Sequence, residues 1–115
     1  MATFVITKNA HSKYKLAYHD YKGTAIAVST ALESKTDCLM TIELYKKKFH
    51  QLIFSICKTQ KEQHYFQCEL DEEIIFKSRK FNTLLRMEKA LDDFKKNFVP
   101  SEVLDFTENI FEPHT

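Results

Sequence analysis

Cys57, His64 and Cys68 are the residues of this chain whose types most readily suggest a metal site. A tetrahedral zinc site needs four nitrogen or sulfur ligands, which are usually closely spaced in knuckles or turns. No fourth ligand stands at a suitable spacing, and strand alternation groups Cys68 with Phe66 and Leu70 on a core side. We therefore expect no metal and no cofactor, and a packing role for these three side chains.

Two lysine clusters are the second group that could do chemistry, at residues 46–48 and 95–96. Clustered cations can contact phosphates, and Lys47 and Lys96 are the candidates for such a surface, joined by residues 79–80 if the fold brings them close. Lysines in the last turn of a helix are already sufficiently explained by the negative end of the helix dipole. A nucleic-acid contact is therefore an alternative to a structural role.

Catalytic chemistry has little support in the sequence. A cysteine or serine nucleophile needs a neighbouring base, but Cys38 falls on an apolar stripe and most of the five histidines fall in expected turns or chain ends. The chain has one glycine and no GxSxG, P-loop or GxGxxG motif. We therefore predict that the protein is not an enzyme.

Composition limits the fold more firmly than the function. The chain has 115 residues, 43% of them hydrophobic, with ten phenylalanines and five tyrosines, which suffices for one core. We expect a single domain over residues 1–115. The 17 basic and 16 acidic residues nearly balance, which argues against a general nucleic-acid or membrane-surface binder and leaves room for a local patch.

The cellular compartment is predicted from the cysteines and from the absence of long apolar runs. Three cysteines without a CxxC spacing are typical of reduced thiols in a reducing compartment. The first residues lack the apolar run of a signal peptide, and no stretch of about 18 apolar residues could span a membrane. We therefore expect a cytoplasmic protein with no membrane partner.

Two stretches of the chain have a helical period. In the second half, apolar residues recur every three or four positions and therefore lie on one side of a helix; they are Leu84, Met87, Leu91, Phe94 and Phe98. Forty-nine residues earlier, a matching stripe consists of Cys38, Ile42, Tyr45 and Phe49. The shared register indicates that one structural unit occurs twice.

The expected helix ends agree with this register. Ser34 and Asp37 form a capping-box pattern at the start of the first helix. Thr83 occupies the equivalent place before the second helix, with Asn82 as a competing cap. Pro100 ends the second helix, because proline lacks the amide hydrogen and clashes with the preceding turn.

Strand-like alternation precedes each helix. The segments are residues 4–8, 14–18 and 24–29, then 54–58, 66–70 and 73–78, with a last strand over 102–106. Ser29 and Ser78 end the third strand of each half, where each is expected to bond a backbone group. The chain therefore divides into repeat one (about 3–50), repeat two (about 52–106) and a tail (107–115).

These elements define the predicted architecture. A unit of about 50 residues buries too little surface to be stable alone, so two units should share one core. We predict an α+β fold in which two tandem β-β-β-α(-β) repeats share one antiparallel sheet, with both helices packed on it and an approximate two-fold relation between the halves.

Each half resembles the repeat of the YegP-like family, small proteins of unknown function found mostly in bacteria. In the first half the resemblance is carried by Phe4, Tyr14, Leu16, Gly23, Ile26, Ser29, Leu32 and Ser34. In the second half it is carried by Phe54, Phe66, Cys68, Ile75, Ser78, Phe81 and Thr83. The resemblance implies a tandem, monomeric form of one sheet with two helices, and it brings no activity with it. The sequence departs from the family where Lys22 precedes Gly23 in place of asparagine, and at Asp71 and Glu72, a turn without glycine.

The functional expectation is a non-catalytic binding or interaction module. The sheet face opposite the helices would be partly uncovered, and Tyr14 and Tyr18 are the candidates for exposed aromatics there. We favour a protein partner slightly over nucleic acid, which would instead use Lys47 and Lys96. A monomer is favoured over a dimer, although open edge strands could pair two chains.

Overall fold

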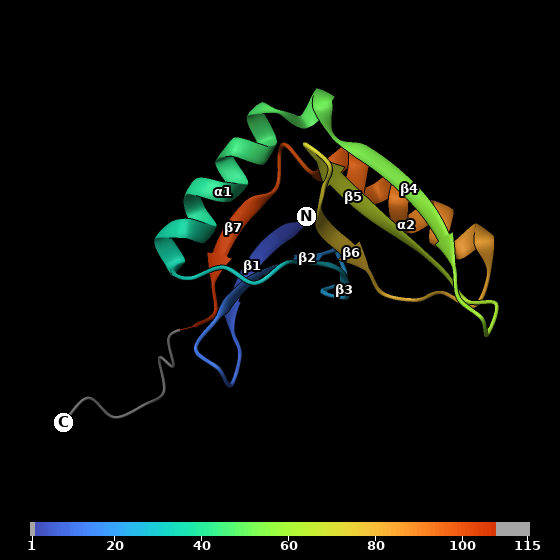
Figure 1. Ribbon diagram of the computed structural model, residues 1–115, viewed down its shortest axis with the longest axis horizontal. Helices are drawn as coiled ribbons and strands as arrows, with labels where there is room; N and C mark the ends of the chain where they lie inside the picture. The colour runs from blue at the N-terminus through green and yellow to red at the C-terminus, as the bar shows by residue number, and fades with distance from the viewer. Residues whose placement is uncertain (1, 108–115) are drawn as a thin grey trace.

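The computed structural model describes residues 2–107, which form one mixed sheet and two α-helices (Figure 1). The elements are β1 (Thr3–Lys8), β2 (Tyr14–His19), β3 (Ala25–Ser29), α1 (Lys35–Lys47), η1 (Phe49–Gln51), β4 (Ile53–Lys58), β5 (His64–Leu70), β6 (Glu73–Ser78), α2 (Leu84–Asn97) and β7 (Glu102–Asp105). The strands and helices predicted from the sequence are all present. Most of the predicted tail, residues 108–115, lies outside the described part of the chain.

The sheet has the strand order β4-β5-β6-β3-β2-β1-β7. Each neighbouring pair is antiparallel except β1 and β7, which run parallel from Thr3 opposite Glu102 to Ile6 opposite Asp105. The prediction of a wholly antiparallel sheet is therefore wrong at this edge. The reason is that α2 carries the chain back to the end of the sheet where β1 begins, so that β7 enters in the same direction as β1.

The two halves meet at the centre of the sheet, where β3 pairs with β6. This junction is short and joins Ala27 to Ser78, Val28 to Lys77 and Ser29 to Phe76. From it the order runs outward as β2 and β1 on one side and as β5 and β4 on the other. Residues far apart in the sequence, around 25–30 and 74–80, are thereby brought side by side.

The serines that end β3 and β6 form equivalent hydrogen bonds. The Ser29 hydroxyl accepts from the Leu16 amide at 2.8 Å and donates to the carbonyl of Thr30. The Ser78 hydroxyl accepts from the Phe66 amide at 2.9 Å and donates to the carbonyl of Arg79. The predicted backbone-bonding role of both serines is confirmed, and it fixes where each strand gives way to the segment before its helix.

Both helices begin at side-chain caps. Ser34 accepts from the Asp37 amide at 3.0 Å, and Thr83 accepts from the Arg86 amide at 3.2 Å, so Thr83 rather than Asn82 is the cap of α2. Phe49, which the periodicity placed on the first helix, lies instead in the following 3-10 turn.

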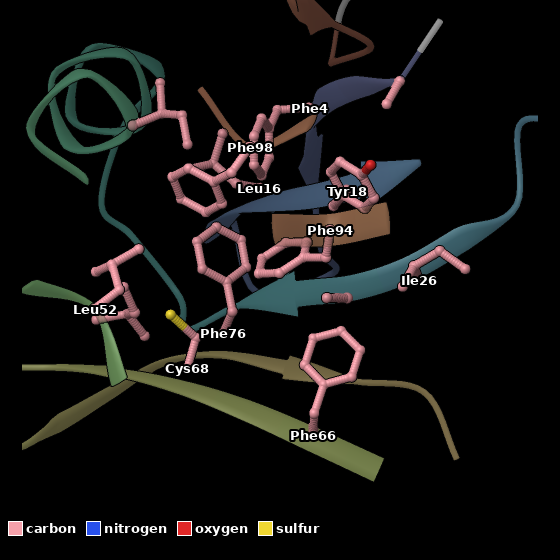
Figure 2. Close-up of a cluster of buried hydrophobic side chains, with 14 of the residues drawn as sticks. Phe4, Leu16, Tyr18, Ile26, Leu52, Phe66, Cys68, Phe76, Phe94 and Phe98 are labelled. Carbon is pink, nitrogen blue, oxygen red and sulfur yellow. The ribbon is translucent and has the colours of Figure 1, made fainter. Parts of the chain in front are cut away.

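Aromatic rings fill the space between the helices and the sheet (Figure 2). Phe94 of α2 lies at the centre of the cluster, and its ring centroid is 4.9 Å from that of Tyr18, 5.2 Å from that of Phe98 and 5.4 Å from that of Phe66. Two of these three pairs meet edge to face, the arrangement that aromatic quadrupoles prefer. The core therefore draws on strands of both halves, as expected for units that share one interior.

Candidate anion-binding site

The tyrosines that the sequence proposed as a partner surface do not lie on an open face. Tyr18 is fully buried between the sheet and α2, and its hydroxyl donates to the Asp93 carboxylate at 2.7 Å. Burial, together with this carboxylate, raises the pKa of the Tyr18 hydroxyl far above its usual value. Tyr14 is half-buried on the same side of β2 and packs against the core, with the Lys8 ammonium 5.7 Å from its ring centroid. The prediction that Tyr18 is exposed is therefore wrong, because strand alternation places it with Leu16 beneath the helices.

The aromatic on the opposite face of the sheet is Tyr65 instead. It is half-buried, and the Lys77 ammonium of β6 lies 5.2 Å from its ring centroid. The signal was present in the sequence, because Tyr65 alternates with the core residues Phe66 and Cys68 and must therefore point away from them.

The helix-end lysines lie near one another but are mostly engaged locally. The C-terminal ends of α1 and α2 converge (Figure 1), and the rings of Phe49 and Phe98 are 5.5 Å apart there. The Lys46 ammonium donates to the carbonyl of Ser101. Lys96 pairs with the carboxylate of Asp92, and the Lys95 ammonium lies over the Phe54 ring of β4. Lys47 and Lys96 are both exposed, but Lys96 is paired with a carboxylate.

Arg79 and Lys80 do not join those lysines. They precede α2, whose 14 residues separate them from the Lys95 and Lys96 end by about 20 Å of helix. They contribute instead to a second collection of cations, around a concavity at the N-terminal part of α2.

We call this concavity the basic cleft, and its volume is about 530 Å³. It lies between the turn joining β2 to β3, the segment over residues 79–82, and one side of α2. Five cations line it, namely Lys22, Arg79, Lys80, Arg86 and Lys89. The only carboxylates in the lining are Asp20 and Asp93.

The two carboxylates of the basic cleft are occupied by other groups. Asp20 accepts from the backbone amides of Lys22 and Thr24 at 3.0 Å each and holds the turn before β3. Asp93 accepts from the Tyr18 hydroxyl and from the Asn97 side-chain amide. Within residues 2–107, none of the five cleft cations forms an ion pair. The cleft therefore has an excess of three positive charges that local carboxylates do not compensate.

Backbone hydrogen bonds hold the segment that carries two of these cations. The Arg79 amide donates to the carbonyl of Ile26 at 2.8 Å, and Phe81 exchanges two backbone bonds with His64. The Arg79 guanidinium lies 5.3 Å from the centroid of the Phe81 ring, a cation–π distance. The segment is thus fixed against β3 on one side and β5 on the other.

A corresponding hollow of about 570 Å³ lies beside α1 in the first half. Its lining includes Ala31, Asp37 and Met40, which stand forty-nine residues before Lys80, Arg86 and Lys89 of the basic cleft. It contains one cation, Lys47, and three carboxylates. A helix and the segment before it therefore line a hollow in each half, without clustered cations beside α1 and with them beside α2.

The three candidate metal ligands do not converge. Cys68 is buried toward the helices, and burial raises the pKa of its thiol to about 12. Cys57 pairs with Tyr65 across the strands and so faces the other side of the sheet, and the backbone of His64 pairs with Lys58 and Phe81. Over the described range, 2–107, no three His, Cys, Asp or Glu side chains come together as a metal site would require.

The basic cleft could be predicted from the sequence only in part. Arg86 and Lys89 are three residues apart on one helix face, which periodicity reveals. The contribution of Lys22 depends on β3 lying beside β6, a pairing between the two halves that no local pattern encodes.

The fold is that of a small α+β protein with two helices on a seven-stranded sheet, and two solved structures share it. A UPF0339 protein from Shewanella oneidensis has a TM-score of 0.80 at 14% identity, over 99% of this chain and 98% of its own. The E. coli protein of unknown function YegP has a TM-score of 0.78 at 18% identity, over 94% of this chain and 95% of its own. The YegP-like resemblance seen in the sequence is therefore confirmed for the fold.

No family model matches the sequence, and no curated protein does. Neither helix within residues 2–107 has the length and apolar composition that crossing a membrane requires.

Proposed function

We propose that this protein is a non-catalytic binding module and that its ligand is an anion held in the basic cleft. The observation that carries this proposal is the uncompensated charge of the cleft, which the corresponding hollow of the first half lacks. The fold can form this hollow without cations, so packing alone does not require them.

Arg86 lies at a position in α2 that is unfavourable for a cation in the folded protein. It lies in the first turn of α2, where the positive end of the helix dipole repels a cation, and that turn has no acidic residue. Asp37 occupies the matching position of α1, where its carboxylate favours the helix. A bound anion would offset this repulsion, so the position of Arg86 supports the proposal.

The lining of the cleft supports binding rather than catalysis. It contains no cysteine, histidine or serine, and its neutral hydrogen-bonding side chains beyond Tyr21 are Thr24 and Asn82. The pairing of a serine or cysteine nucleophile with a histidine base is therefore absent from this lining.

We also propose the finer organisation expected from the sequence: two tandem repeats with an approximate two-fold relation, in one monomeric domain. The equivalent hydrogen bonds of Ser29 and Ser78 support the repeat. So do the equivalent bridges from Tyr14 to Leu32 and from His64 to Phe81. The free cysteines support a reducing, cytoplasmic compartment.

Tripolyphosphate is a suitable probe, because it tests anion binding without any other recognition. At about 100 times its Kd, it should stabilise the wild-type protein against urea by about 2.7 kcal/mol. The variant Arg86→Asp/Lys89→Met, which installs the residues of the first half, should lose this effect. Without ligand it should be as stable as the wild type, or more stable by about 0.3–1 kcal/mol, because an acidic residue now occupies the first turn.

The control is Lys47→Asp/Lys96→Met, which changes the net charge equally but lies outside the basic cleft. It should keep the stabilisation by tripolyphosphate. Equal loss in the two double variants would mean that net charge rather than the cleft attracts the anion, and no stabilisation of the wild type would refute the proposed function.

A further inference from the structure

The basic cleft continues into a second hollow. This hollow, the β3–β6 groove, has a volume of about 710 Å³ and follows the junction between the two halves. It shares Ile26 and Arg79 with the basic cleft. Its cations are Lys15, Lys77 and Arg79, and its lining contains no carboxylate. The two hollows therefore adjoin at Ile26 and Arg79, and we call them together the basic path.

Aromatic rings lie along this path, each beside a cation. At the basic cleft, Tyr21 is 69% exposed, and Phe81 is half-buried with the Arg79 guanidinium against its ring. Next to the β3–β6 groove, Tyr65 is half-buried with the Lys77 ammonium over its ring. Each of the three rings therefore has a cation next to it, which for Tyr21 is the Lys22 ammonium at 5.6 Å from the ring centroid.

We propose that single-stranded nucleic acid binds along the basic cleft and the β3–β6 groove, with phosphates at the cations and unpaired bases against the aromatic rings. This inference rests on the proposed anion-binding function and names its ligand class. Positively charged grooves with aromatic side chains on which bases stack are the general means of binding single strands.

Other polyanions fit the path less well. An acidic peptide would pair with the cations but would gain little from Tyr21, Phe81 and Tyr65. A duplex keeps its bases stacked inside, where these rings cannot reach them. Each hollow has the size of a site for one small ligand, so a path through both accommodates more than one nucleotide.

The first half offers no second path of this kind. Its hollow is lined by Leu32 where the basic cleft has Phe81, by Met40 where it has Lys89, and by Asp37 where it has Arg86. We therefore expect one strand to bind per protein chain.

The test is fluorescence anisotropy with labelled oligothymidylates of increasing length, compared with a duplex of the same length and with an oligoglutamate peptide. Affinity should rise with length until both hollows are filled and then level off at one strand per chain. Affinity should fall as the salt concentration rises. Lys77→Val installs the residue that lies opposite it on β3, and it should make the plot of log K against log salt less steep by about 0.7.

A second pair of variants separates base stacking from charge. Phe81→Leu, the residue of the first half, and Tyr21→Ala on the exposed turn should each weaken oligothymidylate binding at least about fivefold. Tripolyphosphate has no base to stack, so both variants should weaken its binding less than they weaken oligothymidylate binding, and Tyr21→Ala carries little risk to folding because the ring is largely exposed.

The outcomes distinguish this inference from the proposed function. If tripolyphosphate binds while affinity for oligothymidylate does not grow with length, or if both ring variants bind as the wild type does, the single-strand inference fails and anion binding stands. Tighter binding of the duplex or of oligoglutamate would also overturn the inference. If neither tripolyphosphate nor oligothymidylate binds, both proposals fail.

Discussion

Tyr18→Phe tests the correction that the structure makes to the predicted partner surface. The substitution removes only the hydroxyl, because the ring still packs edge to face against Phe94 and Phe4 at 4.9 and 5.4 Å. The lost hydrogen bond, 2.7 Å to the Asp93 carboxylate, belongs to a class worth about 1.5–3 kcal/mol. Asp93 is half-buried and keeps a bond from Asn97, so we expect the lower end, about 1.5 kcal/mol.

Urea unfolding measures this difference. With an m-value of about 1.5 kcal/mol/M, the midpoint of Tyr18→Phe should fall by about 1 M while m stays constant. Tyr21→Phe is the matched control, because it deletes the same hydroxyl from an exposed side chain and should change stability by less than about 0.5 kcal/mol. If both variants unfold at the wild-type midpoint, Tyr18 does not act as a buried hydrogen-bond donor.

The same bond predicts a pH dependence. The pKa of Tyr18 is higher in the folded than in the unfolded protein, so folding favours the protonated hydroxyl. Its contribution is fully present below the unfolded pKa of about 10 and is lost as the pH rises beyond that value. Wild type should therefore lose more stability than Tyr18→Phe above about pH 10, and parallel curves there would contradict the assignment.

Three further predictions concern the turn, the core and the thiols. Glu72→Gly should stabilise the protein by about 1 kcal/mol in urea unfolding, because Glu72 has a φ of 68° in a turn that suits glycine. An unchanged urea midpoint would show that the backbone of this turn is not strained. Phe94→Ala should cost about 3–5 kcal/mol by the same assay, since Phe94 lies at the centre of the aromatic cluster, and a cost below about 1 kcal/mol would contradict that placement. A thiol reagent at neutral pH should modify Cys57 first, because Cys38 and Cys68 are buried and burial raises the pKa of both thiols. Mass spectrometry measures the order of labelling, and simultaneous labelling of the three cysteines would refute it.

Local patterns predicted the elements of this fold because they depend on neighbouring residues. Ser34 caps α1 as its spacing from Asp37 indicated, and alternation located each strand. The direction of β7 was not predictable in this way, since it depends on which sheet edge is open when the chain leaves α2.

The candidate site likewise has features that local patterns predict and features that depend on the tertiary structure. Alternation placed Tyr18 with Leu16, a core residue, so its burial was implicit in the pattern that suggested the strand. The grouping of Lys22 with Arg86 requires the pairing of β3 with β6, which arises only when the two halves assemble. Local pattern therefore identified individual cations, and tertiary structure decided which of them share a cleft.

The parallel pairing of β1 and β7 has a mechanical consequence. The two strands run in the same direction from Thr3 and Glu102 to Ile6 and Asp105. Tension applied at residues 3 and 105 would pull the strands past each other along their length, so that all their mutual hydrogen bonds bear the load together. An antiparallel β7 would instead have been peeled away one bond at a time. The edge strand thus makes the fold resistant to stretching from its ends.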